Sequence, residues 1–302
     1  MELEKPKRKS GGEKRRTGPQ FSLTHRDRMI MLYIWRWKVA STRSVHEAVN
    51  RTVSPYTTYK VLDRLERNHM VECRLHLGER FNVWQLTEFG FHHIKDYLTN
   101  LKEDGYLSEN HRHDRLVQAF QLGEWATHQF PKVIFYTEQE MRRREIENYP
   151  EWVPQTNEHR ADGYTRIVGE KKPWTLAYEV ELSAKNVQKY EGVLRFYRTS
   201  RLVDRVLWLV ESDMVRDTIL RAKTCIKDDT TNYHVFVDLA DYEKNGWDAA
   251  VTNERSQTLF TLREKYRGIC GDLSGEIIGQ FRGQSTVPVH LAKQKVIGKS
   301  KT

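Results

Sequence analysis

Residues 174–182 read Trp-Thr-Leu-Ala-Tyr-Glu-Val-Glu-Leu, and this stretch decides the fold of the larger part of the chain. Its apolar, aromatic and β-branched residues predict a buried strand. The segment at 160–168, Arg-Ala-Asp-Gly-Tyr-Thr-Arg-Ile-Val, has the same character and ends at a Gly-Glu-Lys-Lys-Pro turn. The two segments are therefore predicted to be neighbouring strands of one sheet.

Strands and helices alternate on both sides of this pair. Further strands are predicted at 133–137, 205–210 and 233–239. Helices are predicted at 109–129, 138–146, 184–200 and 213–224, and residues 241–267 are predicted to be mostly helical. Single helices between strands indicate an α/β (α+β) sandwich with a central mixed sheet.

The N-terminal third has a different pattern. Helices are predicted at 24–40, 42–50 and 54–70, the last opened by a Ser54 cap with Pro55 at the first helical position. Alternating strands at 71–77 and 81–86 flank a turn at 78–80, and a further helix is predicted at 87–102. Three helices and a hairpin predict a winged helix-turn-helix. The segment Phe-Asn-Val-Trp-Gln-Leu-Thr-Glu-Phe-Gly also resembles the LTxxG signature at the wing exit of many winged-helix regulators.

The helix at 54–70 is the candidate recognition helix. Opposite its apolar residues lie Thr57, Lys60, Arg64 and Arg67, at i, i+3, i+7 and i+10. This spacing places three cations and a hydroxyl on one stripe, which suits phosphates and base edges. The alternatives are an ordinary solvated helix face, or a winged helix that binds only protein.

The charge of the chain is concentrated at its ends. The 302 residues carry a net charge of +9; residues 1–16 contribute +4 and residues 282–302 contribute +5. Between these ends, residues 17–98 sum to +4 and residues 99–281 to −4. A basic first domain with basic tails favours a polyanionic partner, most simply nucleic acid, although short Lys/Arg tails also aid solubility.

Composition excludes other classes of protein. Mean hydropathy is −0.75, and no apolar run approaches the roughly 20 residues that span a bilayer, so no membrane insertion is expected. The first residues lack the apolar core of a secretory signal. The cysteines Cys73, Cys225 and Cys270 lie too far apart for a disulfide framework or a zinc cluster, which favours a cytoplasmic location.

Three carboxylates form the candidate chemical site. Asp162 lies on the first of the two central strands, and Glu179 and Glu181, at i and i+2, share a face of the second. Carboxylates on a buried strand are costly without a partner, and a hard divalent cation such as Mg²⁺ or Mn²⁺ supplies one. Lys185 follows the strand, with Ser183 as the expected cap of the next helix, and is suited to neutralise a phosphate or orient water. The alternatives are surface carboxylates on an edge strand and a solvated helix lysine.

This arrangement resembles the PD-(D/E)XK superfamily of restriction-endonuclease-like nucleases. Asp162 matches the first acidic position and Glu179 the second, while Glu181 occupies the usual lysine position. The resemblance implies a restriction-endonuclease-like fold with Asp162, Glu179, Glu181 and Lys185 as catalytic residues and the three carboxylates as metal ligands. Lys185 is then either a migrated lysine or only a residue at a helix start.

A closer resemblance covers residues 25–212. The order of the winged helix, His113-Asp114, residues 137–142, Ala161-Asp162-Gly163, the Glu179–Glu181 tripeptide, Tyr190 and Tyr197 is similar to the replication-relaxation family, which includes the MOBC-type relaxases. It implies Mg²⁺- or Mn²⁺-dependent nicking of DNA at a plasmid transfer origin, which starts conjugative mobilisation. Implied partners are double- and single-stranded origin DNA and accessory mobilisation or coupling proteins.

These observations divide the chain into a disordered basic arm (1–20), a winged-helix DNA-binding domain (21–104), a nuclease domain (105–281) and a disordered basic tail (282–302). The alternative function is a non-catalytic replication or transcription regulator with an inactive nuclease-like domain, which the missing lysine favours.

Tyr190 and Tyr197, seven residues apart, are more typical of a core than of a covalent nucleophile. His111-Arg112-His113 likewise fits a helix start better than the paired histidines of rolling-circle nucleases.

Overall fold

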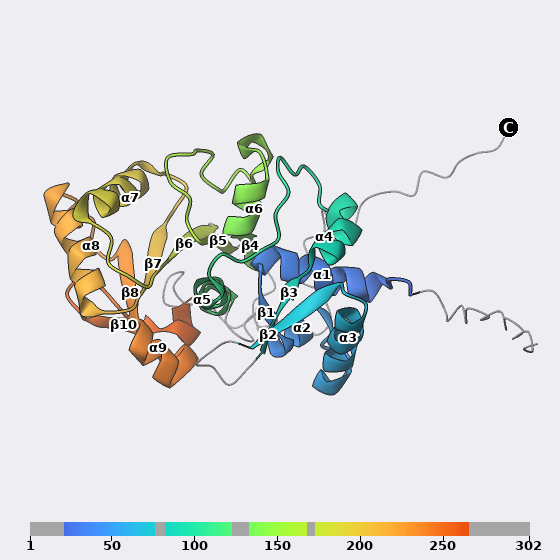
Figure 1. Cartoon of the computed structure of the whole chain (residues 1–302). Helices are drawn as coiled ribbons and strands as arrows, with labels where there is room; N and C mark the ends of the chain where they lie inside the picture. The colour runs from blue at the N-terminus through green and yellow to red at the C-terminus, as the bar shows by residue number, and fades with distance from the viewer. Residues whose placement is uncertain (1–20, 76–81, 123–132, 168–172, 266–302) are drawn as a thin grey trace, which may run out of the picture.

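The computed structural model describes residues 21–75, 82–122, 133–167 and 173–265 (Figure 1). Several predictions lie outside the described residues: the arm at 1–20, the turn at 78–80, the end of the helix at 109–129, residues 266–281 and the tail at 282–302. Cys270 lies outside them as well. The prediction of a mixed α/β fold built on a mixed sheet is confirmed.

The N-terminal part contains helices around a small antiparallel sheet with the strand order β1-β3-β2. All three predicted helices form, and Ser54 caps the third as expected, since its hydroxyl accepts a hydrogen bond from the Thr57 amide. One core joins these elements, with Ile30, Trp35 and Leu62 among its buried residues. The elements are α1 (His25–Trp37), β1 (Ala40–Ser41), α2 (Thr42–Val49), α3 (Pro55–Arg67), β2 (Val71–Leu75), β3 (Asn82–Leu86), α4 (Glu88–Ile94) and η1 (Lys95–Tyr97).

The C-terminal part is built on a seven-stranded sheet of order β10-β9-β8-β7-β6-β5-β4. Strands β6, β7 and β8 are parallel, and the other neighbouring pairs are antiparallel. The strands are β4 (Val133–Thr137), β5 (Gly163–Ile167), β6 (Trp174–Glu181), β7 (Arg205–Val210), β8 (His234–Asp238), β9 (Ala250–Thr252) and β10 (Thr258–Thr261). The helices are α5 (His111–Leu122), α6 (Glu138–Arg143), α7 (Val187–Thr199), α8 (Asp213–Cys225) and α9 (Leu239–Asn245), and the short 3₁₀ turns are η3 (Ile146–Asn148), η4 (Gly246–Asp248) and η5 (Leu262–Glu264).

Side chains alternate between two hydrophobic cores on opposite faces of this sheet. On β6, Leu176, Tyr178 and Val180 belong to the core that also contains residues of α5 and α9. Ala177 belongs to the core beneath α7 and α8, which pack together (Figure 1). Because strand side chains alternate, Glu179 and Glu181 lie on the same face as Ala177, toward α7.

Several predicted boundaries are wrong. The helix predicted at 87–102 ends at Ile94 and continues only as a 3₁₀ turn, and the helix predicted at 138–146 ends at Arg143. Residues 241–267 are not mostly helical, because the short antiparallel strands β9 and β10 extend the sheet there. Asn186, not Ser183, caps α7, accepting a hydrogen bond from the Lys189 amide at 2.9 Å.

Candidate active site

Pairing of β5 with β6 brings Asp162 to the two glutamates. Asp162 directly precedes β5 and so does not lie on the strand as predicted. Its amide donates to the Tyr178 carbonyl at 3.0 Å, and its carboxylate accepts from the Val180 amide at 2.7 Å. These two bonds fix the Asp162 carboxylate beside Val180, the residue between Glu179 and Glu181 on β6.

Glu179 is buried and is held by two side chains that contact the same carboxylate oxygen. His159 Nε2 lies 2.6 Å from Oε1, and the Tyr197 hydroxyl donates to the same atom. Burial lowers the His159 pKa, but the charge and the hydrogen bond of Glu179, together with the Asp162 charge, raise it above its ordinary value. The contact with Glu179 therefore favours the cationic form of His159.

Glu181 is also buried and faces Lys185. The Lys185 Nζ lies 2.6 Å from Glu181 Oε1, and the Tyr190 hydroxyl lies 3.4 Å from Oε2. Burial raises the Glu181 pKa to about 7; the Lys185 charge opposes this rise, whereas the Glu179 and Asp162 charges add to it. The pKa of Glu181 therefore lies near neutral pH chiefly because its carboxyl group is buried.

His113, at the start of α5, bridges two aspartates. Its Nε2 lies 3.4 Å from Asp162 Oδ1 and its Nδ1 lies 3.5 Å from Asp114 Oδ1. Burial lowers the His113 pKa, but hydrogen bonds and charge attraction from both aspartates raise it to about 10. His113 therefore links the start of α5 to Asp162 through contacts with two carboxylates.

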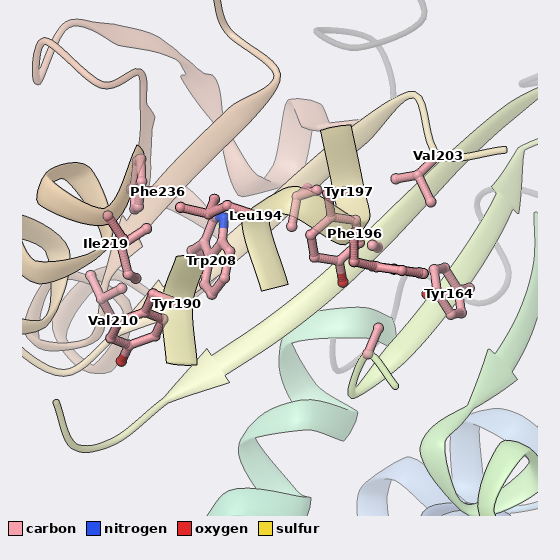
Figure 2. Close-up of a cluster of buried hydrophobic side chains, with 14 of the residues drawn as sticks. Tyr164, Tyr190, Leu194, Phe196, Tyr197, Val203, Trp208, Val210, Ile219 and Phe236 are labelled. Atoms are coloured by element: carbon pink, nitrogen blue, oxygen red, sulfur yellow. The ribbon is translucent and has the colours of Figure 1, made fainter. Parts of the chain in front are cut away.

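Two tyrosines complete the site from α7. Tyr190 and Tyr197 are fully buried in the core of Figure 2, as predicted. Their hydroxyls nevertheless contact Glu181 and Glu179, a role that the sequence pattern did not indicate. His159 was also missed, because it lies in an irregular segment with no periodic signal.

The three carboxylates suit a hard divalent cation by their chemistry, since all their donor atoms are oxygens. Their arrangement is not that of a formed metal site: among the described residues, no group of three His, Cys, Asp or Glu side chains is placed to hold an ion. Each carboxylate instead contacts a basic partner: His113, His159 or Lys185. Holding a cation here requires the acidic side chains to exchange these partners for the ion.

The predicted DNA-binding stripe on α3 is not uniform. Lys60 and Arg67 are exposed, although Arg67 pairs with Asp63. Thr57 is half-buried and lies 3.0 Å from the Ser54 hydroxyl. The Arg64 guanidinium lies 2.5 Å from the buried carboxylate of Asp27 on α1, so Arg64 ties α3 to α1 and is not an unconstrained DNA contact.

Comparison of the chain with family models, with curated proteins and with solved structures gives no match. Within the described segments, no helix is both long enough and apolar enough to cross a bilayer.

Proposed function

We propose that this protein is a DNA-binding, divalent-cation-dependent endonuclease that nicks a plasmid transfer origin to start mobilisation. The observation that supports the proposal best is the convergence of Asp162, Glu179, Glu181 and Lys185 at the end of β6. The resemblance to winged-helix regulators and to restriction-endonuclease-like relaxases supplies the architecture and the target. Single- and double-stranded origin DNA are the proposed substrates, and accessory mobilisation or coupling proteins the proposed partners.

In this proposal Asp162, Glu179 and Glu181 would hold Mg²⁺ or Mn²⁺. The cation would supply Lewis-acid polarisation of the scissile phosphate. Glu181 would also orient the attacking water. Lys185 is half-exposed and contacts Glu181, and in this proposal its ammonium would neutralise a phosphate oxygen.

The second candidate function is a DNA-binding replication or transcription regulator without catalysis. The contacts of all three carboxylates with protein cations favour it, because a site closed by His113, His159 and Lys185 is electrostatically satisfied without a metal. The position of Glu181 where the resembling nucleases carry lysine favours it too.

One experiment separates the two functions. Purified full-length protein is incubated with a supercoiled origin plasmid and Mg²⁺ or Mn²⁺, with a chelator control, and open circles are scored. Chelator-sensitive nicking supports the endonuclease. Specific origin binding without open circles under either cation assigns the protein to the regulator class.

Lys185→Ala is expected to slow nicking by roughly tenfold. Removing a rigid oxyanion-hole donor typically slows an enzyme by about 10² or more. We expect a smaller reduction in the nicking rate here, because the Lys185 side chain is 48% exposed and water screens its charge. Single-turnover nicking rates measure the effect, with Lys185→Arg as the charge-conserving control. Wild-type rates in Lys185→Ala would assign this lysine to the solvated helix start.

The exposed cations of α3 give a prediction for DNA affinity. Lys60→Ala with Arg67→Ala is expected to weaken origin binding and to lower the salt dependence by about one unit of slope per lost phosphate contact. Arg64 is left intact, because its removal would leave the buried Asp27 carboxylate without this cationic partner. Fluorescence anisotropy across a salt series measures the slope, and an unchanged isotherm would exclude α3 from the interface.

A further inference from the structure

The solvent face of α7 carries a basic stripe. Lys189, Gly192 and Arg195 follow one another at i, i+3 and i+6, and all three are exposed. Residues three and four apart are neighbours on a helix surface, so the glycine lies between the two cations. The opposite face of the same helix buries Tyr190 and Tyr197.

Gly192 has no packing role that explains it. A glycine inside a helix costs about 1 kcal/mol relative to alanine, and a conformational or packing reason usually accompanies it. A Cβ built at Gly192 meets nothing within 4 Å, in contrast to Gly90 and Gly163, where backbone or side-chain atoms fill that space. The backbone of Gly192 is helical and has no positive φ. The bare surface at Gly192 is therefore available for close approach of a molecule from outside the fold.

The charge around Gly192 identifies the kind of molecule. Residues 185–201 contain five basic side chains and one acidic side chain, although residues 99–281 as a whole carry a net charge of −4. The one acid, Glu191, already pairs with Arg195 at 3.1 Å. The basic segment begins at Lys185, which contacts Glu181 of the candidate active site.

We propose that the exposed face of α7, centred on Gly192, binds the sugar–phosphate backbone of the DNA strand that leads into the active site. Lys189 and Arg195 contact phosphates, and Gly192 lets the strand lie against the helix backbone. The proposal rests on the proposed function in that DNA is the ligand, and it adds a contact surface in the C-terminal part. Figure 1 shows α7 well separated from α3, so the two helices contact different stretches of nucleic acid.

The first test removes the charges. Lys189→Ala with Arg195→Ala is expected to lower affinity for mixed-sequence DNA by tenfold or more and to lower the salt slope by about two, uniformly across sequences. Arg255→Ala, at an exposed turn outside α7, is the control for loss of positive charge. The proposal is overturned if the α7 double variant and the Arg255 control bind alike.

The second test fills the bare surface without changing charge. Gly192→Leu is expected to hold or raise the thermal midpoint, because leucine favours a helix and nothing clashes, while DNA affinity falls. Unchanged affinity in this variant contradicts the close-approach role. Wild-type protein that binds no DNA at low salt overturns the proposed function together with this inference, whereas wild-type binding with unaffected α7 variants overturns the inference alone.

Discussion

Asp162→Asn is expected to reduce nicking by on the order of 10² or more while DNA binding persists, because groups that act around one cation lose activity together. Asparagine keeps the volume and can still accept the hydrogen bond of the Val180 amide, so the β5–β6 junction stays formed. Glu179→Gln is expected to have a similar effect, since it removes the charge that His159 faces. Single-turnover nicking and DNA binding by the same preparations measure the two properties separately.

The tyrosines provide the matched controls for this prediction. Tyr190→Phe and Tyr197→Phe remove hydroxyls that contact Glu181 and Glu179 but leave both carboxylates in place. Both variants are expected to nick far faster than Asp162→Asn. Cleavage abolished by either tyrosine change, with Asp162→Asn still active, would contradict the metal-dependent assignment and point to a covalent tyrosine intermediate.

The sequence predicted most of the fold because its strands are strongly patterned. The largely apolar and aromatic segments at 174–182, 205–210 and 233–239 correspond to β6, β7 and β8 at the centre of the sheet. The sequence did not predict the β9–β10 edge of the sheet, because these strands have only three and four residues. Such short segments give too weak a periodic signal beside helix-favouring neighbours. The domain boundary at 104/105 stays a prediction, as do the winged-helix and nuclease names of the two parts.

The acidic residues of the site were predictable because they lie close in sequence to two paired strands. Their partners were not, because tertiary packing alone brings His113 and His159 to Asp162 and Glu179. The contact of Arg64 likewise depends on tertiary packing and could not be predicted from the sequence. Helical periodicity placed it on the outer stripe of α3, but its long side chain reaches the buried Asp27 of a different helix.

The contact between the N-terminal and C-terminal parts includes a group of buried charges. At the end of α1, the Arg36 guanidinium donates twice to Glu140 of α6, at 2.9 and 3.0 Å, and once to the Phe135 carbonyl. Lys38, two residues further along the chain, contacts Asp114 at 3.0 Å and Glu138 at 2.6 Å. Asp114 in turn contacts His113, so these ion pairs continue to Asp162 in the candidate active site.

Arg36→Met is therefore expected to destabilise the protein by about 3 kcal/mol at neutral pH, because it leaves a buried carboxylate without its main partner. The Glu140 side chain is 4% exposed, and Arg144 at 3.8 Å compensates only in part. Urea unfolding at pH 7 measures the loss. Arg67→Ala, which breaks an exposed pair within α3, is the control and should change stability by less than about 0.5 kcal/mol.

Acid titration distinguishes lost charge pairing from lost packing. Burial alone would raise the Glu140 pKa, but the Arg36 and Arg144 charges, together with hydrogen bonds from Arg36 and the Thr137 amide, hold it below its ordinary value of 4.5. The wild-type pair therefore stabilises the fold above about pH 4.5, and its contribution declines as pH falls through the lowered pKa. In Arg36→Met, Glu140 loses that opposing charge and its pKa rises, so the destabilisation relative to wild type shrinks between pH 7 and pH 4.

Arg36→Met combined with Glu140→Gln should regain part of the stability at pH 7, because the buried charge is gone while glutamine can still cap α6. A destabilisation that is independent of pH and not relieved by Glu140→Gln would show that Arg36 acts through packing alone, and the ion pair would then not be what holds α1 against α6.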